Sequence, residues 1–122
     1  MNTPQLILIA GPYRSGTQDN PELIEKNVQL MTDIALKVYE LGHLPVLGEW
    51  LALPLMEKAG SKQIGDEIFN ALFHPIAVQL IDFCSAVLRV GGASQGADEM
   101  VKTGLDKGKI IYRRLSEIPL LK

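Results

Sequence analysis

The chain has 122 residues, with 12 Lys and Arg against 14 Asp and Glu, so its formal net charge is −2. This length fits one domain over residues 1–122, without room for a second core. The sequence has no basic run of the kind that neutralises a nucleic-acid backbone, so nucleic acid is not an expected partner. Cys84 is the only cysteine, which excludes an internal disulfide and favours a reducing compartment. Without a signal-peptide pattern or the roughly 18 apolar residues of a membrane span, we expect a cytoplasmic protein with no membrane partner.

Apolar runs and helical periodicities alternate along the chain. Residues 6–10 form a continuous apolar run, typical of a parallel strand covered on both faces. Asn20 and Pro21 are typical of a helix start, and apolar residues recur at spacings of four and three from Ile24 to Val38. We predict further strands over residues 44–47, 86–90 and 109–112, and helices over 49–58, over 64–83 with an interruption at His74-Pro75, and over 97–106. This alternation predicts an α/β fold with a doubly wound parallel sheet of flavodoxin-like or Rossmann-like type, in which a fifth strand could lie within residues 48–63 or in the tail.

Two glycine-containing loops follow predicted strands, residues 11–16 after the first strand and residues 91–96 after the third. In open α/β sheets, ligands bind beyond the carboxyl ends of the strands, where the strand order reverses. With a strand order of 2-1-3-4, both loops line one crevice. The candidate binding residues are Gly11, Pro12, Tyr13, Arg14 and Ser15 of the first loop, Gly92, Ser94 and Gly96 of the second loop, and Glu49 after the second strand.

The residue types of the two loops suit an anionic ligand with a planar part. Ser94 can cap the following helix, whose free N–H groups form an anion site, and Gly92 and Gly96 allow close approach of the backbone. The alternative is a strand-to-helix turn that needs glycine for geometry alone. Arg14 can hold a phosphate or carboxylate with two hydrogen bonds, and Tyr13 can stack on a base or sugar. Their alternative is an exposed arginine beside a half-buried tyrosine.

Asp98 and Glu99 are the candidate catalytic carboxylates. They open the helix after the second glycine loop, where acidic side chains gain about 0.3–1 kcal/mol from the helix dipole without any catalytic role. In a catalytic role, one of them attacks the anomeric carbon of a sugar or stabilises an oxocarbenium-like state there. Residues 92–96 also match the G-x-S-x-G turn of serine hydrolases. That arrangement places its histidine after the serine, whereas both histidines here precede it.

The remaining polar candidates carry weaker signals. Two histidines and one cysteine, widely separated, predict no metal site. His43 follows a helix and is predicted to be a solvated cap, whereas His74 is predicted either to face the crevice or to end a helix. Trp50 is predicted to be a core or interface residue.

Three segments, in order along nearly the whole chain, resemble nucleoside 2-deoxyribosyltransferase-like proteins. They are residues 8–13 (Leu-Ile-Ala-Gly-Pro-Tyr), 42–46 (Gly-His-Leu-Pro-Val) and 86–98 (Ala-Val-Leu-Arg-Val-Gly-Gly-Ala-Ser-Gln-Gly-Ala-Asp). The most similar subgroup comprises short deoxyribosyltransferase-like domains and nucleoside 5′-monophosphate N-glycosidases. The resemblance implies a homo-oligomer of at least two subunits. It also implies cleavage or transfer at the N-glycosidic bond of a nucleoside or nucleoside 5′-monophosphate, without a cofactor.

The resemblance further implies a glutamate that acts on C1′ from the helix after the Ser-x-Gly turn, and a turn that binds the 5′-hydroxyl or 5′-phosphate. This chain departs from that pattern at two positions. The glutamate is expected four residues after Gly96, where the chain has Met100, and Glu99 is displaced by one residue, or about 100° on a helix. The aspartate expected before the third strand is replaced by Ser85, with Asp82 a turn earlier.

Two hypotheses follow. The chain is an N-glycosidase or 2-deoxyribosyltransferase that uses Asp98 or Glu99, with Arg14, Ser94 and the loop amides holding the phosphate. Alternatively, it is a catalytically silent module that binds a nucleotide.

Overall fold

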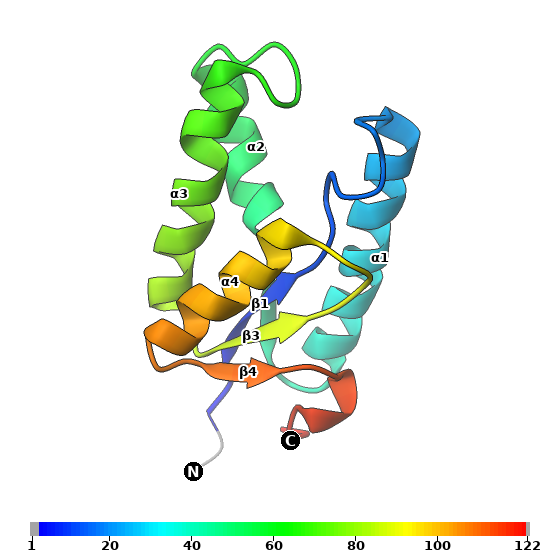
Figure 1. Cartoon of the computed structure of the whole chain (residues 1–122). Coiled ribbons are helices and arrows are strands. Elements are labelled where there is room, and N and C mark those ends of the chain that lie inside the picture. The colour runs from blue at the N-terminus through cyan, green and yellow to red at the C-terminus, as the bar shows by residue number, and fades with distance from the viewer. Residues whose placement is uncertain (1–2, 122) are drawn as a thin grey trace.

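The computed structural model describes residues 3–121, which form a four-stranded parallel sheet with helices on both faces (Figure 1). The strands are β1 (Leu6–Ala10), β2 (Leu44–Val46), β3 (Ala86–Arg89) and β4 (Ile110–Tyr112), and the helices are α1 (Pro21–Glu40), α2 (Gly48–Lys58), α3 (Glu67–Phe83) and α4 (Gln95–Asp106). The strand order is β2-β1-β3-β4 and every pairing is parallel. The doubly wound α/β prediction is therefore confirmed, and the strand order is the 2-1-3-4 order on which a crevice shared by the two glycine loops depends.

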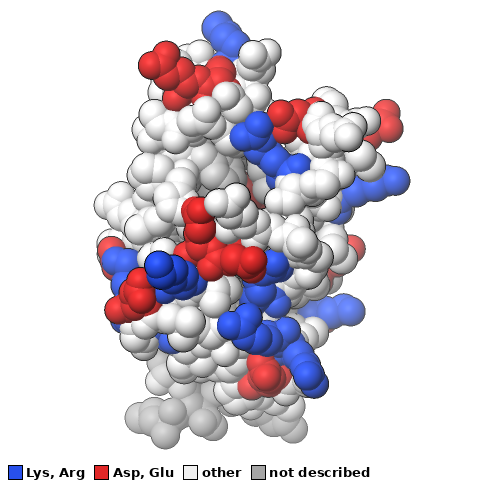
Figure 2. Space-filling model, viewed as in Figure 1, with Lys and Arg blue, Asp and Glu red and all other residues white. Residues whose placement is uncertain are grey.

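Both segments in which a fifth strand was considered have other structures. Residues 48–58 are α2, and the tail after β4 contains a 3₁₀ turn over Leu115–Glu117. Four strands are thus found within residues 3–121. None of the helices in this range is long and apolar enough to cross a membrane. On the face shown in Figure 2, acidic and basic side chains are intermixed.

The strand β1 is central because its side chains alternate between two cores, as a strand requires. Ile7 and Ile9 pack with the α1 residues Met31 and Val38 on one face. Leu8 and Ala10 pack on the other face with residues of α3 and α4, among them Ala77, Ile81 and Val101. The helices α2 and α3 extend beyond the carboxyl edge of the sheet, where a third cluster joins them to the loop after β1.

The helix starts follow local sequence signals. Asn20 caps α1 by accepting a hydrogen bond from the Glu22 N–H at 2.9 Å, and Pro21 occupies the first helical position, as predicted. At the other end Gly42 has a φ of 99°, which lets the chain turn into β2. The edge strand β2 contains Pro45, whose missing donor is tolerated at an edge.

Helix α3 corrects the sequence prediction at two points. It begins at Glu67, after the capping residue Asp66, and it continues through Pro75 without interruption. The proline removes the hydrogen bond to the carbonyl of Ala71. Because Pro75 and Ala71 are both exposed, water can satisfy that carbonyl, and the packing of the buried face holds the helix together.

His43 is buried, which corrects its prediction as a solvated cap. It is 4% exposed, its Nδ1 accepts a hydrogen bond from the Gln5 N–H at 3.0 Å, and its Nε2 lies 2.7 Å from the Pro119 carbonyl oxygen. An Nδ1 that accepts requires the proton on Nε2, which therefore donates to Pro119. The imidazole thus connects the segment before β1 to the C-terminal tail.

We expect His43→Ala to lower the free energy of unfolding by about 1–3 kcal/mol, because the Gln5 N–H and the Pro119 carbonyl lose the buried imidazole that joins them. Urea denaturation measures this change. The control is Leu44→Ala at the neighbouring position, which is 56% exposed and should change the midpoint little. Equal midpoints for the two variants would contradict the bridging role of the imidazole.

Candidate active site

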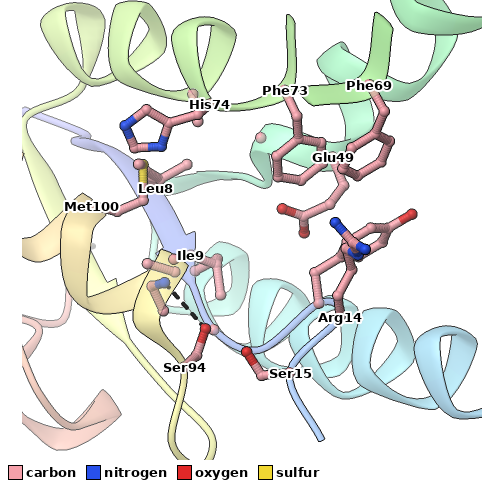
Figure 3. A pocket seen from close by; sticks show the side chains of 17 residues that line it. Leu8, Ile9, Arg14, Ser15, Glu49, Phe69, Phe73, His74, Ser94 and Met100 are labelled. Carbon is pink, nitrogen blue, oxygen red and sulfur yellow. Dashed lines mark hydrogen bonds between the residues drawn. The ribbon is translucent and has the colours of Figure 1, made fainter. Parts of the chain in front are cut away.

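A cavity of about 300 Å³ lies at the carboxyl end of β1, between α2, α3 and α4 (Figure 3). Both glycine loops contribute to its wall, together with residues of the three helices. The lining residues are Leu8, Ile9, Ala10, Gly11, Tyr13, Arg14, Ser15, Gly48, Glu49, Phe69, Phe73, His74, Ala77, Ser94, Gly96, Ala97 and Met100. Among the binding residues predicted from sequence, only Pro12 and Gly92 do not line this cavity.

The two loops touch each other directly beyond the paired strands. The Val90 N–H donates to the Ala10 carbonyl at 2.9 Å, which extends the pairing of β1 and β3 into both loops. Gly91 then has a φ of 78°, and a Cβ on it would lie 2.6 Å from Cδ of Pro12. This close approach requires glycine at position 91. Pro12 and Gly91 therefore set the spacing of the loops, although neither lines the cavity.

Glu49 places a buried carboxyl group in the cavity. Only one residue separates β2 from α2, so the first turn of α2, which contains Glu49, starts at the carboxyl edge of the sheet. The side chain is directed between Phe73 and Arg14 (Figure 3), the residue is 8% exposed, and Oε2 has no hydrogen-bond partner in the described part of the chain. Burial raises the pKa of Glu49 from 4.5 to about 7, opposed by a hydrogen bond from its own backbone.

Three stacked aromatic rings form one wall of the cavity. Phe69 and Phe73, one turn apart on α3, have ring centroids 4.9 Å apart and planes inclined by 13°. Tyr13 stacks on Phe73 with centroids 5.4 Å apart. Burial, and secondly the charge of Glu49, raise the pKa of Tyr13, so its phenol remains neutral. The flat apolar wall suits a planar ring. The two phenylalanines were not predicted as site residues. Their spacing of four residues, which places both on one face of a helix, was the signal in the sequence that could have identified them.

Arg14 lines the cavity, but its guanidinium group already holds a carboxylate. Nε and Nη2 donate to Oδ1 and Oδ2 of Asp19, both at 2.9 Å, and Cζ lies 5.3 Å from the centroid of the Phe69 ring. The hydrogen bond from Arg14 also lowers the pKa of Asp19. The anion-binding geometry predicted for Arg14 is thus present and is occupied by a residue of the same loop.

The opposite end of the cavity offers hydrogen-bond donors. Ser94 caps α4, its Oγ accepting from the Ala97 N–H at 3.1 Å, which leaves the hydroxyl proton free to donate. The first-turn amides of Gln95 and Gly96 have no partner within the helix. Ser15 also lines the cavity (Figure 3). This end suits an anionic or hydroxylated group.

Asp98 and Glu99, the predicted catalytic pair, lie outside the cavity. The Asp98 side chain is 70% exposed and accepts from Nε of Arg89 at 3.0 Å. The same guanidinium donates to the carbonyl oxygens of Val90 and Gly92, so Asp98 helps to hold the glycine turn. Glu99 does not line the cavity either, and its side chain is 48% exposed.

Met100 and His74 line the cavity, whereas the predicted catalytic carboxylates do not. Nδ1 of His74 lies 3.6 Å from Oε2 of Glu99, and both side chains are about half exposed. Within residues 3–121, no three His, Cys, Asp or Glu side chains are grouped so as to hold a metal ion. Trp50 is 43% exposed and does not line this cavity.

We expect Gly91→Ala to destabilise the protein by about 1–3 kcal/mol. The alanine would have to adopt a left-handed φ, and its Cβ would clash with Cδ of Pro12. Gly92→Ala is the matched control, since no atom lies within 4 Å of its added Cβ. Urea denaturation compares the two. Similar losses of stability in both variants would contradict the close contact of the loops.

We expect Glu49→Gln to stabilise the protein increasingly as pH rises from 4.5 to 7. In the unfolded wild-type chain Glu49 ionises near 4.5, whereas in the folded protein it stays protonated up to about 7. Wild-type stability therefore falls across this window, by up to about 3 kcal/mol, and the deficit is constant above it. Below pH 4.5 both states are protonated and the carboxyl has no such effect.

Urea denaturation at pH 4.5, 6 and 8 measures this difference between variant and wild type. Glu57→Gln, at an exposed carboxylate of the same helix, is the control. A difference that does not change with pH would show that Glu49 ionises normally in the folded protein.

No family model matches the chain, and no curated protein matches it.

Proposed function

We propose that the protein binds a nucleoside or nucleoside 5′-monophosphate in this cavity and cleaves its N-glycosidic bond, as an N-glycosidase or a 2-deoxyribosyltransferase. The observation that carries the proposal is the carboxyl group of Glu49, buried in the cavity with Oε2 unpartnered. A buried acceptor without a partner is costly, and such groups cluster at functional sites. The sequence resemblance described above supports the same reaction.

The chemistry of the cavity wall supports a particular orientation of the ligand. The base stacks against the aromatic wall of Tyr13, Phe69 and Phe73, where apolar contact is greatest. The 5′ end lies at the donors of Ser15 and Ser94. The sugar then lies between these ends, next to the carboxyl group of Glu49.

In the proposed reaction the ionised Glu49 is the nucleophile at C1′. One carboxylate oxygen bonds to C1′ as the bond to the base nitrogen breaks, and the bonding pair leaves with the base, which takes a proton from water. A second water then attacks C1′ and the ester to Glu49 breaks, returning its electron pair to the carboxylate. The remaining proton goes to solvent. In a transferase, the nitrogen of a second base replaces this second water.

Glu49 is preferred over Asp98 and Glu99 because of where each carboxylate lies. Asp98 is paired with Arg89 on the surface, and Glu99 lies outside the cavity with Oε2 3.6 Å from Nδ1 of His74. Met100, at the position where the resemblance expects a glutamate, lines the cavity but has no ionisable group. We therefore assign the reaction to the carboxyl group on the α2 side of the cavity.

Met100 also favours a second candidate function. A cavity that keeps its aromatic wall and donors but carries a thioether at this position is compatible with nucleotide binding without cleavage. In that case Glu49 contributes a hydrogen bond to the ligand.

We expect the wild-type protein to release free base from at least one member of a panel of 2′-deoxynucleosides and their 5′-monophosphates, and Glu49→Gln to lower the rate at least about 100-fold. Release is measured by chromatography at high protein concentration. The matched controls are Asp98→Asn and Glu99→Gln, which remove carboxylates outside the cavity and should retain most of the activity.

The pH dependence tests the form in which Glu49 acts. A nucleophile must be ionised, so the rate should rise with pH through about 7 and then level off. A rate that falls across this range would assign Glu49 to proton donation. Binding of the panel with no release of base by the wild type would favour the binding module, and activity lost only in the Asp98 or Glu99 variants would overturn the assignment to Glu49.

A further inference from the structure

We infer that the cavity selects nucleosides whose base carries a fixed positive charge, as a pyridinium ring does, because the carboxyl group of Glu49 and the aromatic wall together form a site for a flat cation. The inference rests on the proposed function for the reaction at the N-glycosidic bond. It goes further by naming the class of substrate.

Glu49 is the ionisable side chain of the cavity whose charge is not compensated. The other ionisable residues of the wall are Tyr13, Arg14 and His74. Arg14 donates two hydrogen bonds of 2.9 Å to Asp19, and His74 lies 3.6 Å from a carboxylate oxygen of Glu99, so both basic groups face a carboxylate. By contrast, Oε2 of Glu49 is buried without a hydrogen-bond partner in the described part of the chain. Once Glu49 is ionised, a cationic ligand supplies the partner that a buried charge requires.

The aromatic wall beside Glu49 favours the same kind of ligand. The face of an aromatic ring is negative, so it attracts a cation in addition to stacking on it. The chain itself places one planar cation against this wall, because Cζ of Arg14 lies 5.3 Å from the centroid of the Phe69 ring. The carboxyl group of Glu49 is directed between Phe73 and Arg14 (Figure 3). A flat cation stacked on Phe73 therefore gains a ring face and a carboxylate, whereas a neutral base gains the stacking alone.

A second argument comes from the proton that a departing base needs. Within the described residues, the aromatic end of the cavity has no acid placed to supply this proton apart from Glu49, the proposed nucleophile. The phenol of Tyr13 has a raised pKa, which makes it a poor proton donor near pH 7, and His74 lies away from the phenylalanine rings (Figure 3). A pyridinium needs no proton, because the electron pair of the broken bond neutralises its nitrogen.

The reaction of such a substrate is balanced without an acid. An ionised carboxylate oxygen of Glu49 bonds to C1′ while the bond from C1′ to the ring nitrogen breaks, and the electron pair stays on that nitrogen. The released pyridine is neutral. Water then attacks C1′, the ester bond to Glu49 breaks, its electron pair returns to the carboxylate, and the remaining proton of the water goes to solvent.

The probes for binding are the carbocyclic analogues of nicotinamide riboside and of its reduced dihydro form. Only the first has a charged ring, and neither is cleaved, because no oxocarbenium-like state forms without the sugar ring oxygen. Isothermal titration calorimetry of the full chain at pH 8, at which Glu49 is mostly ionised, compares them. We expect the wild type to bind the charged analogue at least about tenfold more tightly than the neutral one.

We expect Glu49→Gln to bind the two analogues with nearly equal affinity, because it removes the charge and keeps the size of the side chain. Glu99→Gln is the matched control, since it removes a carboxylate outside the cavity and should keep the preference.

Phe73→Leu keeps an apolar side chain and the carboxylate but removes the ring face, so we expect it to lower the preference about threefold to fivefold. Phe83→Leu is its control, because Phe83 is 73% exposed at the end of the same helix and does not line the cavity.

Equal binding of the two analogues by the wild type, or a preference that survives in Glu49→Gln, would overturn the inference. Faster release of base from neutral 2′-deoxynucleosides than of nicotinamide from nicotinamide riboside would also overturn it, while supporting the proposed function. The proposed function fails in a different way, when the wild type prefers the charged analogue but releases no base from any substrate. That result supports the cation site and contradicts the cleavage.

Discussion

The parallel pairing of β1 with β3 is the contact on which the candidate site depends. These strands are neighbours in the sheet but lie about eighty residues apart in the chain, and the Ala10 position pairs with Arg89 at their carboxyl ends. Because the strands end together, the loops that follow leave the sheet side by side. The glycine at position 91 then allows them to touch at Pro12. Without this pairing, the arginine of one loop and the capping serine of the other would not face a common space.

A second constraint comes from the carboxyl group that this arrangement buries. A glutamate held in an apolar cavity with one oxygen unpartnered lowers the stability of the fold at neutral pH. Selection for stability alone favours an apolar side chain at that position. A glutamate there costs stability, and a role in binding or converting a ligand accounts for it. The buried Tyr13 and Phe69 and the partly buried Phe73 make the conflict sharper, because their apolar surface does not solvate a charge.

The sequence predicted the sheet well and the chemistry of the site only in part. Strand positions, their order and the start of α1 depend on local patterns and general rules of chain connection, and these predictions agree with the structure. The continuity of α3 through Pro75 depends on tertiary packing, which no local signal encodes. His43 was predicted to be solvated because its partners, Gln5 and Pro119, are distant in the chain.

The predicted catalytic residues also show that local sequence patterns do not determine which side chains the tertiary fold brings to the site. Successive side chains on a helix differ by about 100°, so the prediction of a catalytic carboxylate on α4 depended on knowing which residue faces the sheet. In the structure that residue is Met100, which packs in the core beside the cavity, and both preceding carboxylates face outward. Phe69 and Phe73 became part of the site because α3 lies across the sheet edge from Tyr13, a relation that only the tertiary fold determines.

Two carboxylates near the cavity occupy opposite electrostatic environments, and this difference gives the site its chemical character. Burial raises the pKa of Glu49, whereas the hydrogen bonds from Arg14 lower the pKa of Asp19. Environments that separate the pKa values of neighbouring acids also separate their roles. Asp19 stays ionised and paired with Arg14 in an exposed position. Glu49 is desolvated and close to neutral, so its charge state near pH 7 depends on what enters the cavity: a ligand that places positive charge beside it, such as a developing oxocarbenium centre, favours the ionised form. The fold thus favours an ionised carboxylate at the exposed Asp19 and disfavours one at the buried Glu49 until a ligand with positive charge enters the cavity.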